Sequence, residues 1–417
     1  MKKRLSFLIV LIFILSLCVS GNVNANEVIE LTFVRTGTPE VLRKIFDPII
    51  KSFEEKHPNI KINMQDLGWG DAATTIQTMA ASKTLPDVMY HLPGTIFDLA
   101  EKGLILDLTN YLDEELVNDM YPSMLEAGVF NEKQYMITCG GMTLMMWYNT
   151  ELFEKVGLDP DSPPKDWNEL LDAAERLNAL EDVSGIGMYG KAGGGETSFV
   201  IESFFTGVQG GSAWDNTAGT YYYNTPDGQN KGVEVLDFLH KLSKFAQPGV
   251  VEYGRFDCRT LLRDGKVGIV LDGVNMANQI EKEMNEGILK AALLPAYPGN
   301  ESATAVNVGG WFIPVNSEHP DEAWTFLRFL METENQAAHA AYGSVPILQS
   351  EAKLYEGDAY KQVVIDSVAS SYAEAINPKT NALWQVIGDQ FQMLLLDLQS
   401  PEETMKAIAE EHALILQ

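Results

Sequence analysis

Cysteine is scarce in this chain: only three occur among 417 residues, at Cys18, Cys139 and Cys258. There is no CxxC pair, no HExxH motif and no Cys/His cluster, so the sequence gives no support for a structural or catalytic metal site. Cys139 and Cys258 are far apart in the chain. An oxidising compartment would allow them to form a disulfide, but we expect two unpaired, buried side chains.

Positive charge is scarce too. The chain has 30 Lys and Arg against 58 Asp and Glu, a formal net charge of −28. Such a surface repels nucleic-acid phosphates and anionic lipids, so functions on nucleic acids or membrane surfaces are disfavoured. The sequence also lacks a P-loop, a GxSxG motif and a His-centred triad pattern, so it indicates no standard catalytic site. A glycosidase carboxylate pair is defined by a separation that sequence does not show.

The one long apolar run is at the N-terminus. A basic segment at residues 2–4 precedes an apolar stretch at residues 5–19, which is shorter than the roughly 20 residues of a membrane span. Small residues follow, and we expect a signal peptide of residues 1–25 that is cleaved after Ala25. Residues 15–18 also resemble a lipoprotein box, in which Cys18 would be acylated. On either interpretation the protein is exported, to the periplasm or the cell exterior, and the mature chain is expected to be soluble.

The first part of the mature chain alternates between strands and helices. Residues 30–34 and 60–64 have strand patterns, and residues 41–53 have apolar side chains at helical spacing. A further helix is expected at 72–82 and a strand at 86–90. This alternation is typical of a parallel sheet with helices on both faces. Ligands of such sheets bind beyond the carboxyl ends of the strands, which is where Thr36, Trp69 and His91 lie.

A series of short motifs then carries a family resemblance. Each motif is weak alone, but they occur in one order: Leu85-Pro86-Asp87-Val88, Trp147-Tyr148-Asn149, Pro163-Pro164 with Trp167, Asp264-Gly265-Lys266, Gly309-Gly310-Trp311, Glu322-Ala323-Trp324, and Gly343 with Pro346. This order resembles the extracellular solute-binding proteins of family 1, the maltose-binding-protein-like sugar-binding subunits of ABC importers. The resemblance covers nearly all of the mature chain.

The resemblance implies an α/β fold with two lobes, the type II periplasmic-binding fold, and a ligand cleft between the lobes. Residues 26–140 would form the first part of the N-terminal lobe and residues 141–305 the first part of the C-terminal lobe. Residues 306–335 would be a crossing strand and the return to the N-terminal lobe. Residues 336–417 would be helical and belong mainly to the C-terminal lobe.

The implied function is capture of a mono- or oligosaccharide outside the membrane and its delivery to an ABC-type importer. The lobes would close on the ligand, and the partners would be the sugar and the importer's membrane permease subunits. The protein would be a monomer with no cofactor and no enzymatic activity. Two alternatives stay open: a secreted carbohydrate-active enzyme, and a binding protein for a polyol, glycerol phosphate or uronide.

Polar candidates for the site come from strand ends and from the resemblance. Arg35 and Thr36 end the first strand, and the Arg35 guanidinium could fork onto hydroxyls, onto a carboxylated sugar or into a structural ion pair. His91 ends the third strand. Asp272 follows the strand at 266–271 and could accept hydrogen bonds from hydroxyls. Asn275 stands where the family frequently has Trp, which suggests a hydrogen bond in place of a stacking platform.

Sugar rings present C–H faces that stack on flat aromatic side chains, so tryptophans near the expected cleft are candidates for the site. Trp69, Trp311 and Trp384 are expected to stack on sugar rings from different sides of the cleft. Gly310 and Met142 lie on the two crossing segments, where Met142 would be an apolar wall. Two other tryptophans, Trp167 and Trp324, lie in helix motifs and are expected to belong to the core.

Overall fold

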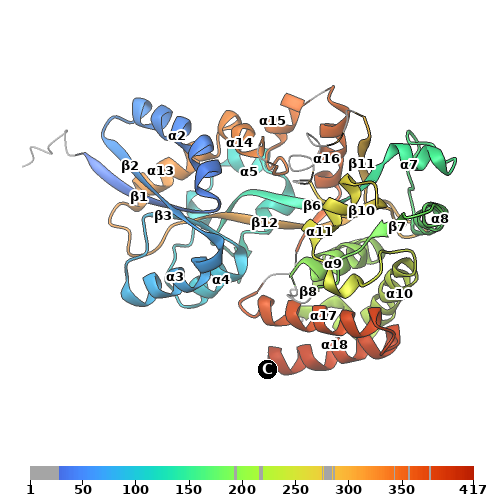
Figure 1. Cartoon of the computed structure of the whole chain (residues 1–417). Helices are drawn as coiled ribbons and strands as arrows, with labels where there is room; N and C mark the ends of the chain where they lie inside the picture. Colours follow the sequence, from blue (N-terminus) through green and yellow to red (C-terminus); the bar gives the residue numbers. More distant parts are fainter. Residues whose placement is uncertain are drawn as a thin grey trace, which may run out of the picture.

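The computed structural model describes residues 28–417, apart from residues 192–194, 216–218, 275, 277–283, 285–286, 342, 356 and 375–376. In α3 (Trp69–Ser82) the side chains at positions 69–71 and 73 are also outside the description. The expected signal peptide and Cys18 precede the first described residue. The described chain forms two α/β lobes joined by long strands (Figure 1).

The N-terminal lobe follows the alternation seen in the sequence. Its elements are β1 (Ile29–Thr36), α2 (Pro39–Lys56), β2 (Ile60–Leu67), α3, β3 (Val88–His91) and α4 (Pro93–Glu101). β1 pairs in parallel with both β2 and β3, which confirms the predicted parallel arrangement here. α2 buries Leu42, Ile45, Phe46, Ile49 and Phe53, one face at helical spacing. The helix continues through Pro48 and therefore does not end at this residue.

Two long antiparallel strands, β6 (Ile137–Asn149) and β12 (Thr304–Phe312), run between the lobes. Their register extends from Thr143 opposite Val306 to Ile137 opposite Trp311. They connect the strands of both lobes into one sheet, in the order β2-β1-β3-β12-β6-β10-β7. The sheet is mixed, because β12 is antiparallel to β3 and β10 is antiparallel to β6.

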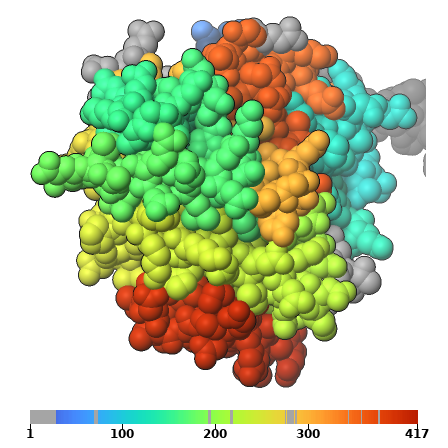
Figure 2. Space-filling model, turned by 90° about the vertical axis from the view of Figure 1, so that its right-hand side faces the viewer, coloured from blue at the N-terminus to red at the C-terminus, as the bar shows by residue number. Residues whose placement is uncertain are grey.

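The C-terminal lobe combines distant parts of the sequence (Figure 2), since the red segment near the C-terminus packs beside the green and yellow middle of the chain. Its elements are α7 (Thr150–Lys155), α8 (Trp167–Asn178), β7 (Ser184–Gly187), α9 (Gly195–Gln209), β8 (Trp214–Asp215), β9 (Thr220–Tyr221), α10 (Pro226–Ser243), α11 (Arg255–Arg263), β10 (Val267–Gly273), β11 (Leu289–Leu293), α17 (Thr380–Leu395) and α18 (Pro401–Leu416). Asp166 caps α8 by accepting hydrogen bonds from the amides of Asn168 and Glu169.

The other elements are α5 (Glu114–Asp119), α6 (Pro122–Glu126), β4 (Val129–Phe130), β5 (Lys133–Gln134), α13 (Pro320–Leu330), α14 (Thr333–Ala340), α15 (Gln349–Ala352), α16 (Ala359–Ala369) and β13 (Ser371–Ala373). α13 and α14 pack on α2 in the N-terminal lobe. Trp167 is buried and stacks on Phe238 with ring centroids 4.2 Å apart, which confirms its core assignment. Trp324 is only partly buried, against Tyr111.

Candidate functional site

A cavity of about 410 Å³ lies where the carboxyl end of β1 and the start of α2 meet the crossing strands β6 and β12. The residues after α14, including Ser344, close another side of it. The cavity therefore has walls from the N-terminal lobe and a floor formed by the strands that join the lobes. Its volume is within the range of small-molecule sites, about 300–1,000 Å³.

Arg35 is the principal charged group of this cavity. It is only 6% exposed, and its guanidinium carbon lies 3.2 Å from the centroid of the Tyr90 ring. Nη1 donates to the Thr36 carbonyl oxygen at 2.5 Å, and Nη2 lies 3.4 Å from His339 Nε2. Its Nε has no hydrogen-bond partner within the described residues, and Arg35 forms no ion pair there. The guanidinium is therefore held by neutral groups.

His339 fixes the far side of that guanidinium. Its Nδ1 lies 2.7 Å from the Cys139 carbonyl oxygen, which can only accept, so Nδ1 carries the proton and Nε2 faces Arg35 as an acceptor. Burial, reinforced by the charge of Arg35, lowers the pKa of His339 to about 4. His339 is consequently neutral at physiological pH and does not repel Arg35.

Glycines on the crossing strands make room for this arrangement. A Cβ added at Gly309 would lie 2.0 Å from Tyr90 Oη, and one at Gly141 would lie 2.5 Å from the Asn307 carbonyl oxygen. A Cβ at Gly140 would lie 2.5 Å from Ser344 Oγ. Side chains at these positions would displace the groups that form the cavity. Glycine is therefore required at positions 140, 141 and 309, because neighbouring groups lie too close to admit a Cβ.

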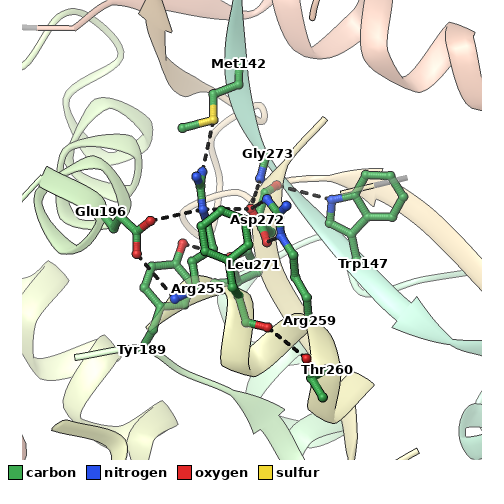
Figure 3. Close-up of polar contacts among 11 residues, drawn as sticks. Met142, Trp147, Tyr189, Glu196, Arg255, Arg259, Thr260, Leu271, Asp272 and Gly273 are labelled. Carbon is green, nitrogen blue, oxygen red and sulfur yellow. Dashed lines mark hydrogen bonds and ion pairs between the residues drawn. The ribbon is translucent and has the colours of Figure 1, made fainter. Parts of the chain in front are cut away.

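Met142, which lines the cavity, also contacts an ion-pair cluster in the C-terminal lobe (Figure 3). Arg255 Nη1 lies 3.2 Å from Met142 Sδ, and Arg255 Nε lies 3.3 Å from Glu196 Oε1. Asp272 is fully buried and accepts from Arg259 Nε at 2.5 Å and Nη2 at 2.8 Å. In this cluster, unlike at Arg35, each guanidinium has a carboxylate nearby.

The structure brings together three of the residues predicted from the sequence: Arg35, Thr36 and Met142 all line the cavity. His91 is buried outside the lining, and burial lowers its pKa to about 4. Gly310 does not line the cavity and lies against Met136 instead: a Cβ added to it would lie 2.3 Å from Met136 Cγ.

The remaining candidates are engaged elsewhere or lie outside the description. Asp272 is occupied by Arg259 as described above. Trp311 is 1% exposed, between the rings of Phe33 and Tyr90, so it is a core side chain in this conformation. Trp384 donates its Nε1 proton to Glu202 Oε1 at 3.0 Å and does not line the cavity. Asn275 and the side chain of Trp69 fall outside the described residues.

Sequence reasoning missed Tyr90, His339 and Ser344, which all line the cavity. Tyr90 precedes the predicted strand-end residue His91, so its place in the strand was a usable signal. Nothing in the sequence around His339 links it to Arg35, 304 positions earlier. As expected, Cys139 and Cys258 are free and buried.

No helix in the described part of the chain combines the length and apolarity needed to cross a membrane. Comparison with known proteins gives a consistent picture. A binding protein of Brucella abortus (strain 2308) is 24% identical over 375 residues, which cover 89% of each chain. A tagatose-bound ABC transporter solute-binding protein of Thermotoga lettingae has a TM-score of 0.77 and 24% identity, covering 93% of this chain and all of that one.

The cyclic α-maltosyl-1,6-maltose binding protein of Arthrobacter globiformis has a TM-score of 0.82 and 20% identity, covering 93% of this chain and 99% of the other. At these identities the structures establish the shared two-lobe fold. Residues 38–337 match the sequence profile of the bacterial extracellular solute-binding proteins. The match spans well over half of the chain and confirms the resemblance seen in the motifs. This protein therefore belongs to the bacterial extracellular solute-binding protein family.

Proposed function

We propose that this solute-binding protein captures a mono- or oligosaccharide outside the cell membrane and hands it unaltered to the permease subunits of an ABC-type importer. The observation that carries this proposal is the cavity at the crossing strands, which combines polar groups with apolar walls. Arg35 and Asn307 place polar side chains at the cavity, whereas Val41 and Ile45 offer apolar contact. The sugar ligands named for the two structural relatives support the same class.

The cavity's position supports capture by closure. Its floor is formed by β6 and β12, the strands about which two lobes can move. A ligand that contacts both lobes would favour a closed state by the contacts that only this state makes. We propose that the lobes divide at the predicted boundaries, near residues 140 and 305, and that the exported protein acts as a monomer after cleavage at Ala25.

The lining also argues against a glycosidase. None of the described residues that line the cavity is Asp or Glu, so the pair of carboxyl groups that glycoside hydrolysis requires is missing from it. The hydroxyl of Ser344 is bound to Gly141, because it accepts from that amide at 2.8 Å. We therefore propose binding without turnover, and a carbohydrate-active enzyme is the alternative to be tested.

The test is a saccharide panel read by melting temperature on the purified mature protein. A ligand that binds only the native state stabilises it by RT ln(1 + [L]/Kd), so the correct sugar should raise the midpoint in a dose-dependent way. Mass spectrometry of the recovered ligand then decides between binding and turnover. Failure of every saccharide, together with a clear shift from an amino acid, would refute the proposal.

A matched pair of variants locates the binding site. Val41 lines the cavity and is 38% exposed, so V41W should fill the cavity without disturbing the core. Val315 is 48% exposed and lies outside the lining, which makes V315W the control. V41W should abolish the thermal shift, and V315W should preserve it. Equal shifts in both variants would place the ligand elsewhere.

A further inference from the structure

We propose that the cavity contains an anion subsite built on Arg35, and that the carbohydrate captured by this protein carries a carboxylate or phosphate group. This inference rests on the proposed function and specifies its ligand. It is carried by three observations: the unbalanced charge of Arg35, the composition of the cavity lining and the open start of α2.

The first observation is that Arg35 is buried and has no counter-ion among the described residues. The groups around its guanidinium are the face of Tyr90, the Thr36 carbonyl oxygen and the neutral His339. Nε, also buried, has no hydrogen-bond partner in the described part of the chain. The nearby cluster shows what the chain does elsewhere, since Arg259 is met by the two oxygens of Asp272.

The second observation concerns the lining. Acidic residues outnumber basic ones 58 to 30 in this chain, yet no Asp or Glu occurs in the described lining of the cavity. Burial of an unpaired guanidinium is costly, and a charge-assisted bond to an anion would offset that cost. Arg35 lies at the cavity wall, and the described lining provides no carboxylate to balance its charge. An anionic ligand bound in the cavity would be its counter-ion.

The third observation is the N-terminus of α2, an 18-residue helix whose first residues also face the cavity. The first N–H groups of a helix lack intrahelical acceptors and carry partial positive charge. In α2 these are the N–H groups of residues 40 and 41, because Pro39, the first helical residue, has none. Thr38 is the N-cap, but its side chain accepts no hydrogen bond from the helix, and both Thr38 and Val41 line the cavity. The first-turn carboxylate of Glu40 is exposed and pairs with Lys44 at 2.8 Å. The helix start therefore adds positive potential beside Arg35.

The chemistry of the two groups defines the ligand class. A guanidinium presents a planar fork of donors that matches a carboxylate or a phosphate. A neutral sugar could also accept from Arg35, but it would leave the charge unbalanced. The ligand we infer is thus a uronate or a sugar phosphate whose anionic group lies between Arg35 and the start of α2.

The experiment compares matched pairs by calorimetric titration of the mature protein: glucuronate with glucose, galacturonate with galactose, and glucose 1-phosphate with glucose. We expect one anionic member to bind at least about tenfold tighter than its neutral counterpart, as a charge-assisted contact in a desolvated site requires. The uronate and phosphate arms distinguish the two sources of the anion. R35Q should erase this preference, and R35K, which keeps the charge and loses the fork, should retain part of it.

R43Q is the control, because Arg43 is a more exposed arginine on α2 that is already paired with Asp66 at 2.9 Å. It should leave every affinity within about threefold. Melting curves of the unliganded variants test folding; if R35Q does not fold, the matched pairs on the wild-type protein decide. Neutral sugars that bind as tightly as their anionic partners would overturn the subsite and leave the proposed function standing. Binding of inorganic phosphate or an amino acid, with no sugar bound, would overturn the carbohydrate ligand.

Discussion

The ion pair between Asp272 and Arg259 offers a sharp test of how the C-terminal lobe is held together. The substitution D272N keeps the shape of the side chain and removes its charge. In the structure Asp272 accepts from two nitrogens of Arg259 and from the Gly273 amide at 2.6 Å. The two charged side chains are 0% and 2% exposed, so solvent screens them very little.

The expected loss follows from this burial. Removing one partner of a buried pair leaves the other as an uncompensated charge, which costs about 3–5 kcal/mol. Arg259 would lose both of its contacts with this carboxylate, and Arg255, whose Nε lies 3.8 Å from Asp272 Oδ1, would keep Glu196 as its carboxylate neighbour among the described residues. D272N should therefore lower the free energy of unfolding by about 3–5 kcal/mol. The double variant D272N/R259M should recover part of the loss, because it also removes the buried cation that faced Asp272.

Urea denaturation of the four members of this double-mutant cycle measures the coupling between the two residues. D264N is the control, because Asp264 is exposed and its ion pair with the neighbouring Arg263, at 2.8 Å, is a surface contact. Its unfolding curve should overlay that of the wild type. If D272N also unfolds at the wild-type urea concentration, the buried pair is not formed as described. Asp272 would then be available to a ligand, as the sequence had suggested.

Three further predictions address the core, the pH response and the crossing strands. W311A should cost roughly 3–5 kcal/mol of stability in denaturant melts and leave ligand affinity of the folded protein within about threefold; a tenfold loss of affinity at unchanged stability would return Trp311 to the site. The pKa of buried His412 is lowered to about 4, so the unfolded state binds the proton more readily between about pH 6.5 and 4, and stability falls as the pH drops through this window. Between pH 7 and 5 the free energy of unfolding of H412Q should therefore fall by roughly 2 kcal/mol less than that of the wild type. Parallel curves of unfolding free energy against pH for the two proteins would contradict this. G309A should displace the Tyr90 ring and weaken anion binding about tenfold, whereas G94A, where nothing lies within 4 Å of the added Cβ, should not.

Local patterns were sufficient to predict much of the fold. β1, α2, β2 and β3 follow the strand and helix periodicities of their own sequences. These features depend on neighbouring residues, so the sequence reveals them directly. The antiparallel insertion of β12 between β3 and β6 depends on a segment more than 150 residues later, and periodicity did not predict it. The resemblance implied a crossing strand there, without its direction or its neighbours.

The site was predictable only in part, for an equally physical reason. Arg35, Thr36 and Met142 were found because strand ends and crossing segments meet at the cavity. Trp311 shares the crossing strand with Gly309 but lies one layer deeper, where Phe46 packs on it and the Arg35 guanidinium carbon lies 5.3 Å from its ring. A sequence motif indicates the strand that approaches a site, whereas the depth of each side chain depends on what covers it.

The overall charge and the local charge of this protein lead to different conclusions about anions, and both hold. A net charge of −28 opposes a polyanion such as a nucleic acid, which would have to bring many phosphates against an acidic surface. A small anion meets only the groups near one cavity, because the more distant exposed charges are screened beyond about 8 Å at physiological ionic strength. The described lining of this cavity presents one buried guanidinium and the start of a helix, and it contains no Asp or Glu. Net charge therefore disfavours a polyanion, while Arg35 is the group that we propose selects a small anionic ligand.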